Sequence, residues 1–235
     1  MGETIWDVCN RFRSTRPQVF AEHFQAWDQI QARPRFNVAP TDQILTVQQE
    51  IGKGRTFSMM RWGLVPSWAP AMSSVNFNAR SEKVTTTPSF SDAIVSGRRC
   101  LIPADGFYEW HTLGTIKQPY CFEVGSGELF AFAGLWDEWK NPNGQAIKSC
   151  VILTTSANPL VAEIHHRMPV ILSPNNYSLW LNSQNLNDVL SVLNPYDAKL
   201  MHRYPVSTRL NDSRNDNPEC AKPIELEIPT QARLF

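Results

Sequence analysis

Three residues of this sequence combine reactive side chains with settings that favour chemistry. Cys9 lies in the polar, basic segment CNRFR, where neighbouring cations favour the thiolate form of a thiol. Glu109 is flanked by two aromatic residues, and partial desolvation there would suit its carboxyl group to proton transfer. His165 belongs to the residue type that titrates near neutrality without assistance. Together the three residue types predict a nucleophile with two proton-transfer partners.

A second set of residues is suited to binding. The amides of Asn37 and Asn78 can orient a substrate without adding charge, and Arg80 can hold a phosphate in a two-pronged contact. Trp62 and Trp68 offer flat faces to unpaired bases, and such stacking contributes roughly 1–3 kcal/mol per base. Taken singly, each residue is more often structural, since asparagines form turns and tryptophans pack in cores. For Trp62, core packing is at least as strong an expectation.

Short β-rich runs dominate the middle of the chain. They are Ile44–Gln48, Thr56–Trp62, Arg99–Pro103, Gly106–His111, Tyr120–Val124, Leu129–Trp136 and Lys148–Thr155. Turn-forming segments rich in glycine and asparagine separate several of them. This spacing is typical of strands joined by hairpins.

Helical segments are fewer and short. They are expected at Pro17–Ile30, Ser89–Ser96, Asn158–Ile164, Pro174–Leu181 and Leu186–Leu193. In the first segment Val19, Phe20, Phe24 and Trp27 would form one apolar face.

The order of these elements predicts the fold class. Strands do not alternate regularly with long helices, so a doubly wound parallel sheet is disfavoured and a mainly antiparallel α+β fold is expected. No internal repeat or linker divides the chain, which predicts one compact domain. The tail Asn211–Phe235 is expected to be irregular, with one strand near Ile224–Ile228.

Composition limits the partners. The formal net charge is zero, with 22 basic and 22 acidic residues, which counts against binding to duplex DNA through bulk electrostatics. The longest strongly apolar stretch, Leu129–Trp136, is too short to span a bilayer, and residues 1–8 do not form a secretory signal. We therefore expect a cytoplasmic protein without membrane association. Arginines crowd the N-terminal quarter and permit a local basic groove: Arg11, Arg13, Arg16, Arg33, Arg35, Arg55 and Arg61.

The remaining cysteines and histidines show no metal-binding spacing. Cys100, Cys121 and Cys150 lie in apolar, strand-like settings and are expected to be small buried hydrophobes. His165 and His166 are adjacent and would point apart on a strand, and no second ligand pair has suitable spacing. A metal hydrolase is the least favoured class, and no metal or other cofactor is expected.

Seven ordered blocks carry a family resemblance: CNRF, RFNVAPT, RWGLVPSWA, NFNARSE, CLIPADGFYEW, IHHRMPVIL and PVS. In this order they resemble the SOS-response-associated peptidase (SRAP) family of abasic-site-processing proteins, from Cys9 to about Asn211. The resemblance implies a compact α+β domain around a β-barrel-like core with a positively charged cleft. It also implies binding to single-stranded DNA. We expect a monomer that is nucleoid-associated when the DNA is damaged.

The resemblance also implies residue roles. Cys9 would be the nucleophile that forms a thiazolidine crosslink with an abasic site, and Asn37 would lie beside the reacting sugar. Glu109 and His165 match the acid–base carboxylate and histidine of the family. The residues implied as DNA contacts are Arg11, Trp68, Asn78, Arg80, Arg167 and Ser207.

The N-terminus departs from the family pattern. The family cysteine directly follows the initiator methionine, whereas residues 1–8 precede Cys9 here, and Asn10 stands where glycine is common. An amide nitrogen cannot form an imine, so the crosslink requires removal of these residues. Either Val8 is the true start, read from a GTG codon, or residues 1–8 are a propeptide cleaved by the Cys9 thiol. The first explanation is favoured, and the SRAP domain is assigned to residues 9–235.

The sequence leaves two other functions open. A cysteine peptidase or amidohydrolase would use Cys9, His165 and Glu109 as nucleophile, base and orienting group. A non-catalytic reader of single-stranded DNA would use Trp68, Arg80 and Arg11 as its platform.

Overall fold

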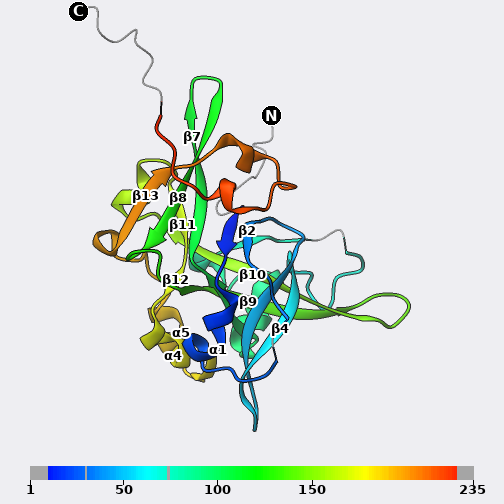
Figure 1. Ribbon diagram of the computed structural model, residues 1–235. Helices are drawn as coiled ribbons and strands as arrows, with labels where there is room; N and C mark the ends of the chain where they lie inside the picture. Colours follow the sequence, from blue (N-terminus) through cyan, green and yellow to red (C-terminus); the bar gives the residue numbers. More distant parts are fainter. Residues whose placement is uncertain (1–9, 30, 73–74, 227–235) are drawn as a thin grey trace, which may run out of the picture.

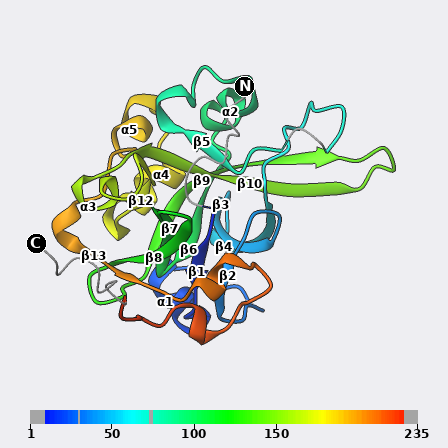
Figure 2. The ribbon, with the colours of Figure 1, turned by 90° about the horizontal axis from the view of Figure 1, so that it is seen from above.

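Five strands close into a barrel in the computed structural model, which describes residues 10–29, 31–72 and 75–226. Around the ring they are β10 (Ala146–Ser156), β4 (Gly54–Trp62), β3 (Gln43–Glu50), β6 (Arg99–Ala104) and β9 (Phe130–Lys140), which pairs again with β10. All contacts around the ring are antiparallel except the parallel pairing of β10 with β4. The β9–β10 hairpin extends beyond the barrel and projects from the body of the molecule (Figures 1 and 2).

A second sheet stands against the barrel. Its order is β13 (Met201–Pro205), β8 (Ile116–Val124), β7 (Gly106–Leu113), β1 (Phe12–Ser14) and β2 (Arg35–Val38). Strand β1 therefore lies between β7 and β2, pairing antiparallel with both. The first described residues of the chain thus lead directly into an interior strand of a sheet.

Three short strands extend the barrel sheet. Strand β5 (Asn78–Arg80) runs parallel to β10, β11 (Arg167–Pro169) pairs antiparallel with β10, and β12 (Ile171–Leu172) pairs with β9. These strands, like β1 and β2, were not predicted from the sequence. Segments of two to four residues are too short to show an alternating apolar pattern.

The helices are short and peripheral. They are η1 (Pro17–Val19), α1 (Phe20–Phe24), η2 (Ser81–Lys83), α2 (Pro88–Val95), α3 (Pro159–Ala162), η3 (Pro174–Asn176), α4 (Tyr177–Asn182), α5 (Leu186–Ser191), η4 (Ala198–Leu200), η5 (Thr208–Asn211) and η6 (Pro218–Cys220). Helices α4 and α5 contact each other, and α4 also contacts β3 and β6 (Figures 1 and 2).

The predicted helix over Pro17–Ile30 is wrong in its length and partly in its buried face. Phe20 and Phe24 are buried as expected, but Val19 is 39% and Trp27 75% exposed. The helix ends at Phe24 because the chain turns away to pair along β4, where a bridge joins Ala26 to Arg55. The tertiary contact with the edge of β4 thus outweighs the helical propensity of the residues after Phe24.

Two large apolar clusters hold the layers together. One packs α1, α2, α4 and α5 against barrel strands, and the other packs the second sheet against the barrel. In the second cluster the ring of Phe12 meets that of Trp62 with centroids 5.3 Å apart. Trp62 is fully buried and its Nε1 donates to the carbonyl of Phe77 at 2.8 Å, so it is a core residue. The predicted α+β class, single compact domain and barrel-like core are confirmed.

The three cysteines predicted to be buried are confirmed as core residues. Cys100, Cys121 and Cys150 have no exposed surface. Burial raises the pKa of the Cys121 thiol to about 12 and raises those of the other two well above the ordinary value. All three are therefore neutral thiols at physiological pH.

The C-terminal segment is irregular in its described part, as expected. The strand predicted near Ile224–Ile228 is reduced to one bridge between Val206 and Pro223, with the Ile224 N–H donating to the Pro205 carbonyl at 3.0 Å. Residues 227–228 lie outside the described residues. Among the described residues, no helix combines the length and apolar character needed to cross a membrane.

Candidate functional site

The first described residues continue the pairing of β1 with β7. Cys9 and residues 1–8 lie outside the described residues. Phe12 pairs with Phe107, and the Tyr108 N–H donates to the carbonyl of Arg11 at 3.0 Å. Followed back along the chain, this antiparallel register runs toward Glu109. The segment that leads to the predicted nucleophile is therefore joined to the strand that carries the predicted carboxylate.

Glu109 is a buried carboxylate. It lies on β7 opposite Tyr120 of β8, and the residue is 5% exposed. Tyr120 and Ile164, which precedes His165 in the chain, both pack against the same apolar cluster. A cross-strand neighbour of Glu109 and the residue before His165 thus contribute to the same apolar cluster, although Glu109 and His165 are 56 residues apart in sequence.

His165 lies in the turn between α3 and β11 rather than on a strand. Its N–H donates to the carbonyl of Val161 at the end of α3. Its ring stacks on that of His166 with centroids 4.5 Å apart, so the prediction that the two point apart on a strand is wrong. The Nδ1 atom lies 3.1 Å from the N–H nitrogen and 3.2 Å from the carbonyl oxygen of Arg167. It therefore has a partner in both the neutral and the protonated form of the ring.

Strand β10 brings other predicted site residues together. Asn78 and Arg80 of β5 pair with Ile152 and Thr154 on one edge of β10, while Arg167 of β11 pairs with Ser156 on the other. Segments that are far apart in sequence thus present an amide and two guanidinium groups around one strand.

Arg167 has an intramolecular partner that the sequence did not reveal. Its Nη atoms donate to the two carboxylate oxygens of Glu82 at 2.6 and 2.9 Å, and Nη2 also donates to the Thr154 carbonyl at 2.8 Å. Glu82 belongs to the NFNARSE block, but nothing in the local pattern predicts a partner 85 residues away. The proposed DNA contact of Arg167 stays a prediction.

Asn37 is fully buried and holds the C-terminal segment. Its Nδ2 atom donates to the carbonyls of Leu210, Asp212 and Asn215 at 3.2, 3.2 and 2.8 Å. Its Oδ1 atom accepts from Nη1 of Arg11 at 3.4 Å. The amide nitrogen therefore has a structural role, and the predicted role beside the reacting sugar stays untested.

Arg11 is also tied to this segment. Its Nη1 donates to the Leu210 carbonyl at 3.0 Å, and its guanidinium lies 6.0 Å from the ring centroid of Trp110. Burial lowers the pKa of Arg11, while the charges of Asp42 and Asp212 act in the opposite direction. The guanidinium remains a cation held beside the strand that follows Cys9.

Trp68 and Ser207 differ in their surroundings. Trp68 is 60% exposed on a loop held to the β9–β10 hairpin, where the Ser67 N–H donates to Asp137 at 2.8 Å and Trp139 donates to the Ala69 carbonyl at 2.7 Å. An exposed indole on an anchored loop is suited to stacking. Ser207 caps η5, since its hydroxyl accepts from the Arg209 N–H at 3.3 Å.

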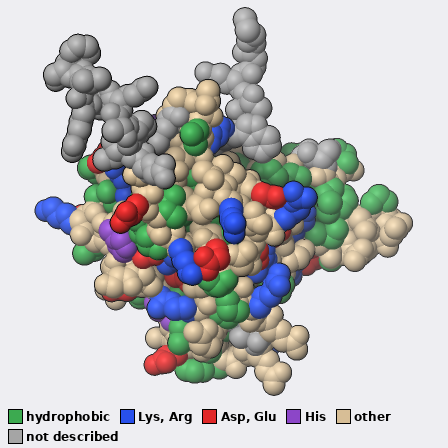
Figure 3. Space-filling view, turned by 45° about the horizontal axis from the view of Figure 1, so that its top comes forward, with side chains coloured by type: hydrophobic (Ala, Val, Ile, Leu, Met, Phe, Trp, Pro, Cys, Tyr) green, Lys and Arg blue, Asp and Glu red, His purple; other side chains and the backbone are tan. Residues whose placement is uncertain are grey.

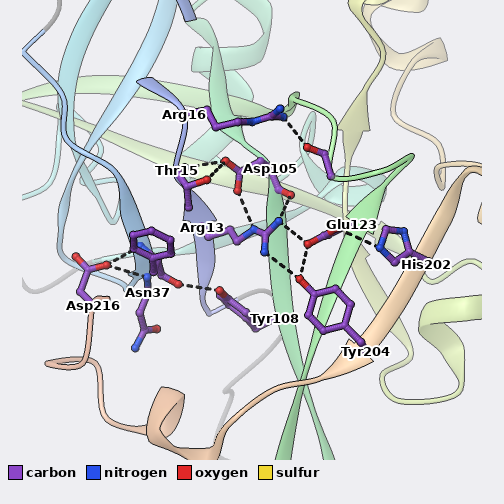
Figure 4. Close-up of polar contacts among 12 residues, drawn as sticks. Arg13, Thr15, Arg16, Asn37, Asp105, Tyr108, Glu123, His202, Tyr204 and Asp216 are labelled. Carbon is purple, nitrogen blue, oxygen red and sulfur yellow. Dashed lines mark hydrogen bonds and ion pairs between the residues drawn. The ribbon is translucent and has the colours of Figure 1, made fainter. Parts of the chain in front are cut away.

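Several N-terminal arginines form ion pairs within the protein. Arg13 contacts Asp105 at 2.8 Å, pairs with Glu123 and donates to the Tyr204 hydroxyl at 3.0 Å (Figure 4). Burial alone would lower the pKa of Arg13, but the surrounding acidic groups raise it above its ordinary value. Arg35 pairs with Asp42 and Asp216. Figure 3 shows basic and acidic side chains interspersed on the face in view.

The fold and site define a class of protein: a compact α+β domain whose first described residues lead into a sheet beside a buried glutamate. Arginines and an exposed tryptophan lie on the segments around its barrel. The family model of SOS response associated peptidases (SRAP) matches residues 8–213. The chain belongs to the SRAP family.

Named relatives and a solved structure agree with this assignment. The chain is 44% identical over 191 residues to the abasic site processing protein YoqW of Bacillus subtilis, covering 79% of this chain and 84% of that protein. It is 34% identical over 235 residues to the abasic site processing protein HMCES of Gallus gallus, covering 86% of this chain and 69% of the relative. A crystal structure of a protein from Bacteroides thetaiotaomicron superposes with a TM-score of 0.84 at 25% identity, covering 92% of this chain and all of the other.

Proposed function

We propose that the protein processes abasic sites in single-stranded DNA by forming a thiazolidine crosslink through Cys9. The observation that carries this proposal is the pairing of β1 with β7, which joins the segment after Cys9 to the strand with buried Glu109. Membership of the SRAP family and the names of the relatives support it. In this proposal the protein is a monomer that acts in the cytoplasm, at the nucleoid when DNA is damaged, without a metal or other cofactor.

The chemistry needs an amine and a thiol on adjacent carbons. A terminal α-amine has a pKa of about 7.7–8.0 and is partly unprotonated at neutral pH. Its nitrogen attacks C1′ of the open-chain sugar aldehyde, and the carbonyl oxygen leaves as water with proton transfer from Glu109 or His165. The Cys9 sulfur then bonds to the imine carbon, and the thiol proton passes to the nitrogen.

Ring closure favours this product over a simple thiol adduct. The thiol is already tethered to the imine, and effective concentrations of ~10⁵ M or more are attainable for well-oriented intramolecular reactions. The same imine permits strand cleavage by β-elimination as a side activity. Proton transfer by Glu109 in the reverse direction would reopen the ring and make the crosslink reversible.

The binding residues would hold the DNA strand. Arg80 and Arg167 would contact phosphates, Trp68 would stack on a base, and Asn78 would lie beside the lesion. Arg11 and Ser207 would contact the DNA strand near the N-terminus of the protein. Asn37, on β2, would orient the sugar of the abasic site.

The N-terminus decides whether this reaction can occur. The proposal requires a free α-amine on Cys9, produced by initiation at Val8 and removal of methionine, or by autoproteolysis at the Val8–Cys9 bond. Intact mass measurement of the native protein, paired with an adduct assay on abasic single-stranded DNA, tests this directly. We expect a mass that begins at Cys9 and an SDS-resistant adduct that Cys9→Ala abolishes.

Two outcomes would favour other functions. Turnover of model peptides without a DNA adduct would support the cysteine peptidase reading with Cys9, His165 and Glu109. Binding to single-stranded DNA with no adduct from the wild-type protein would support the non-catalytic reader. A protein that begins at Met1 and still forms the adduct would contradict the amine mechanism.

A further inference from the structure

Glu82 and Arg167 form an ion pair across the end of β10. Glu82 lies in η2, which follows β5 on one edge of β10, and Arg167 begins β11 on the other edge. Nη1 donates to Oε1 at 2.6 Å and Nη2 to Oε2 at 2.9 Å. Both carboxylate oxygens are therefore engaged by one guanidinium.

The two partners differ in their exposure. The Arg167 side chain is 11% exposed, whereas that of Glu82 is 52% exposed. Thr154 holds Nη2 from the protein side through its carbonyl at 2.8 Å. The carboxylate therefore faces solvent and lies over a largely buried guanidinium. An anion that arrives from solvent must displace this carboxylate to make the same two-pronged contact.

A phosphodiester makes the same type of contact with arginine as a carboxylate does. Both present two oxygens that accept parallel hydrogen bonds from the guanidinium fork. The hydrogen bonds from Arg167 lower the pKa of Glu82, and the charges of Arg167 and Arg80 act in the same direction. Glu82 is therefore ionised at neutral pH, and its carboxylate is the anion bound to Arg167 in the free protein.

We propose that Glu82 is an internal competitor for a DNA phosphodiester: it occupies the Arg167 guanidinium in the free protein and yields it to the backbone on binding. This inference rests on the proposed function, in which Arg167 contacts the strand. Phosphates are present in intact and damaged DNA alike, so they carry no information about a lesion. A competitor at this position weakens binding to intact DNA strands. The discrimination between damaged and intact DNA then depends more on contacts with the abasic sugar.

The test compares two variants that each remove one negative charge. Glu82→Gln keeps the shape of the side chain, and Glu50→Gln is the matched control because Glu50 pairs with Lys53 at 2.8 Å on the exposed β3–β4 turn. The probe is intact oligothymidylate, and fluorescence anisotropy gives the dissociation constant. We expect Glu82→Gln to bind about fivefold more tightly than the wild type, and Glu50→Gln to bind as the wild type does.

A double-mutant cycle separates competition from a general charge effect. Arg167→Lys keeps the positive charge but removes the planar fork. In that background, Glu82→Gln is expected to change the affinity by less than about twofold. An undiminished gain there would overturn the proposal, as would unchanged or weaker binding of the single variant. Thermal melting verifies folding; if Glu82→Gln does not fold, Glu82→Asp, too short for the two-pronged contact, is expected to change the affinity in the same direction.

The design separates this inference from the covalent chemistry. Binding to intact DNA does not involve Cys9, so the Glu82 effect can appear in a protein that forms no adduct. That result would overturn the crosslinking function alone. An adduct from the wild type together with unchanged affinity of Glu82→Gln would overturn the Glu82 inference alone. Absence of any binding to single-stranded DNA would overturn both.

Discussion

The amide of Asn37 illustrates how a residue type leaves its role open. An asparagine beside a substrate and an asparagine that binds backbone carbonyls need the same two donors and one acceptor. Here the donors serve three carbonyls of the segment 210–215. Arg167 shows the same ambiguity, since its fork fits either a phosphate or Glu82. The sequence identifies what such groups can bind, and the fold supplies the partners.

Thr41 and Gln25 are the residues other than glycine that have a positive φ in the described part of the chain, and only Thr41 is β-branched. Its φ is +80°, and the Asp42 N–H donates to the Ala39 carbonyl at 3.1 Å, which closes a turn with Pro40 and Thr41 at its centre. A positive φ at the second central position is typical of a type II turn, where glycine or asparagine is preferred. A β-branched residue in this region costs about 1–2 kcal/mol.

Relief of this strain should stabilise the protein. Thr41→Asn is expected to raise the free energy of unfolding by about 1 kcal/mol, because asparagine tolerates the left-handed region and Thr41 is exposed. Urea denaturation measures the change. Thr86→Asn is the control, because Thr86 is also exposed but has no positive φ. Equal effects of the two substitutions would contradict the strain argument.

At the scale of elements, strand β2 lies at the end of its sheet and depends on the C-terminal segment. One edge of β2 pairs with β1. Asp216, from the C-terminal segment, accepts with its Oδ1 from the N–H groups of Phe36 and Asn37 of β2 at 2.6 and 3.0 Å (Figure 4). Its Oδ2 pairs with Arg35, also of β2. A side chain thus satisfies backbone donors that would otherwise need another strand. This aspartate lies beyond the residues matched by the family model.

Loss of this carboxylate should destabilise the second sheet. Asp216→Ala leaves two backbone N–H groups without their acceptor and removes one of the two carboxylate partners of Arg35, so it is expected to lower the free energy of unfolding by about 2–3 kcal/mol. Asp212→Ala, in the same segment, removes an exposed pair with Arg214 and is expected to change the free energy of unfolding far less. Chemical denaturation compares them. Comparable losses would show that Asp216 does not support β2 in this way.

Element types were more predictable than element ends. The central β-rich runs from Ile44 to Thr155 all became strands, because each is long enough to show its apolar pattern. The helix from Pro17 was placed correctly at its start, but its end depends on the bridge between Ala26 and Arg55. Strands β1 and β5 contain three residues each, and only their neighbours in space make them strands.

For the molecule as a whole, the buried thiols make stability depend on alkaline pH. Burial raises the pKa of Cys100, Cys121 and Cys150 above the value of 9.0 for an exposed thiol. Above pH 9.0 the unfolded chain therefore binds fewer protons than the folded protein. The contribution of the neutral thiols to the free energy of unfolding is complete below that pH. It is lost as the pH rises toward the pKa values of the thiols in the folded protein, and for Cys121 this pKa is about 12.

We expect the free energy of unfolding to fall by about 1.4 kcal/mol per pH unit for each such thiol above that point. Urea titrations across the alkaline range measure the slope of the free energy of unfolding against pH. Cys150→Ala should make this slope shallower by the contribution of one thiol. A stability that does not change through this range would contradict the burial of the thiols.

The sequence by itself determined the α+β class, the main strands, the burial of the three core cysteines and the family resemblance carried by seven ordered blocks. These features rest on local apolar patterns and on residue order, which need no knowledge of distant contacts. Only the tertiary structure decided that Asn37 binds carbonyls of the C-terminal segment and that Arg13 forms ion pairs with Asp105 and Glu123. It also decided that Glu82 forms an ion pair with Arg167. The partners of a charged or amide side chain depend on which strands pair and in what register, and that is set by the packing of the whole chain.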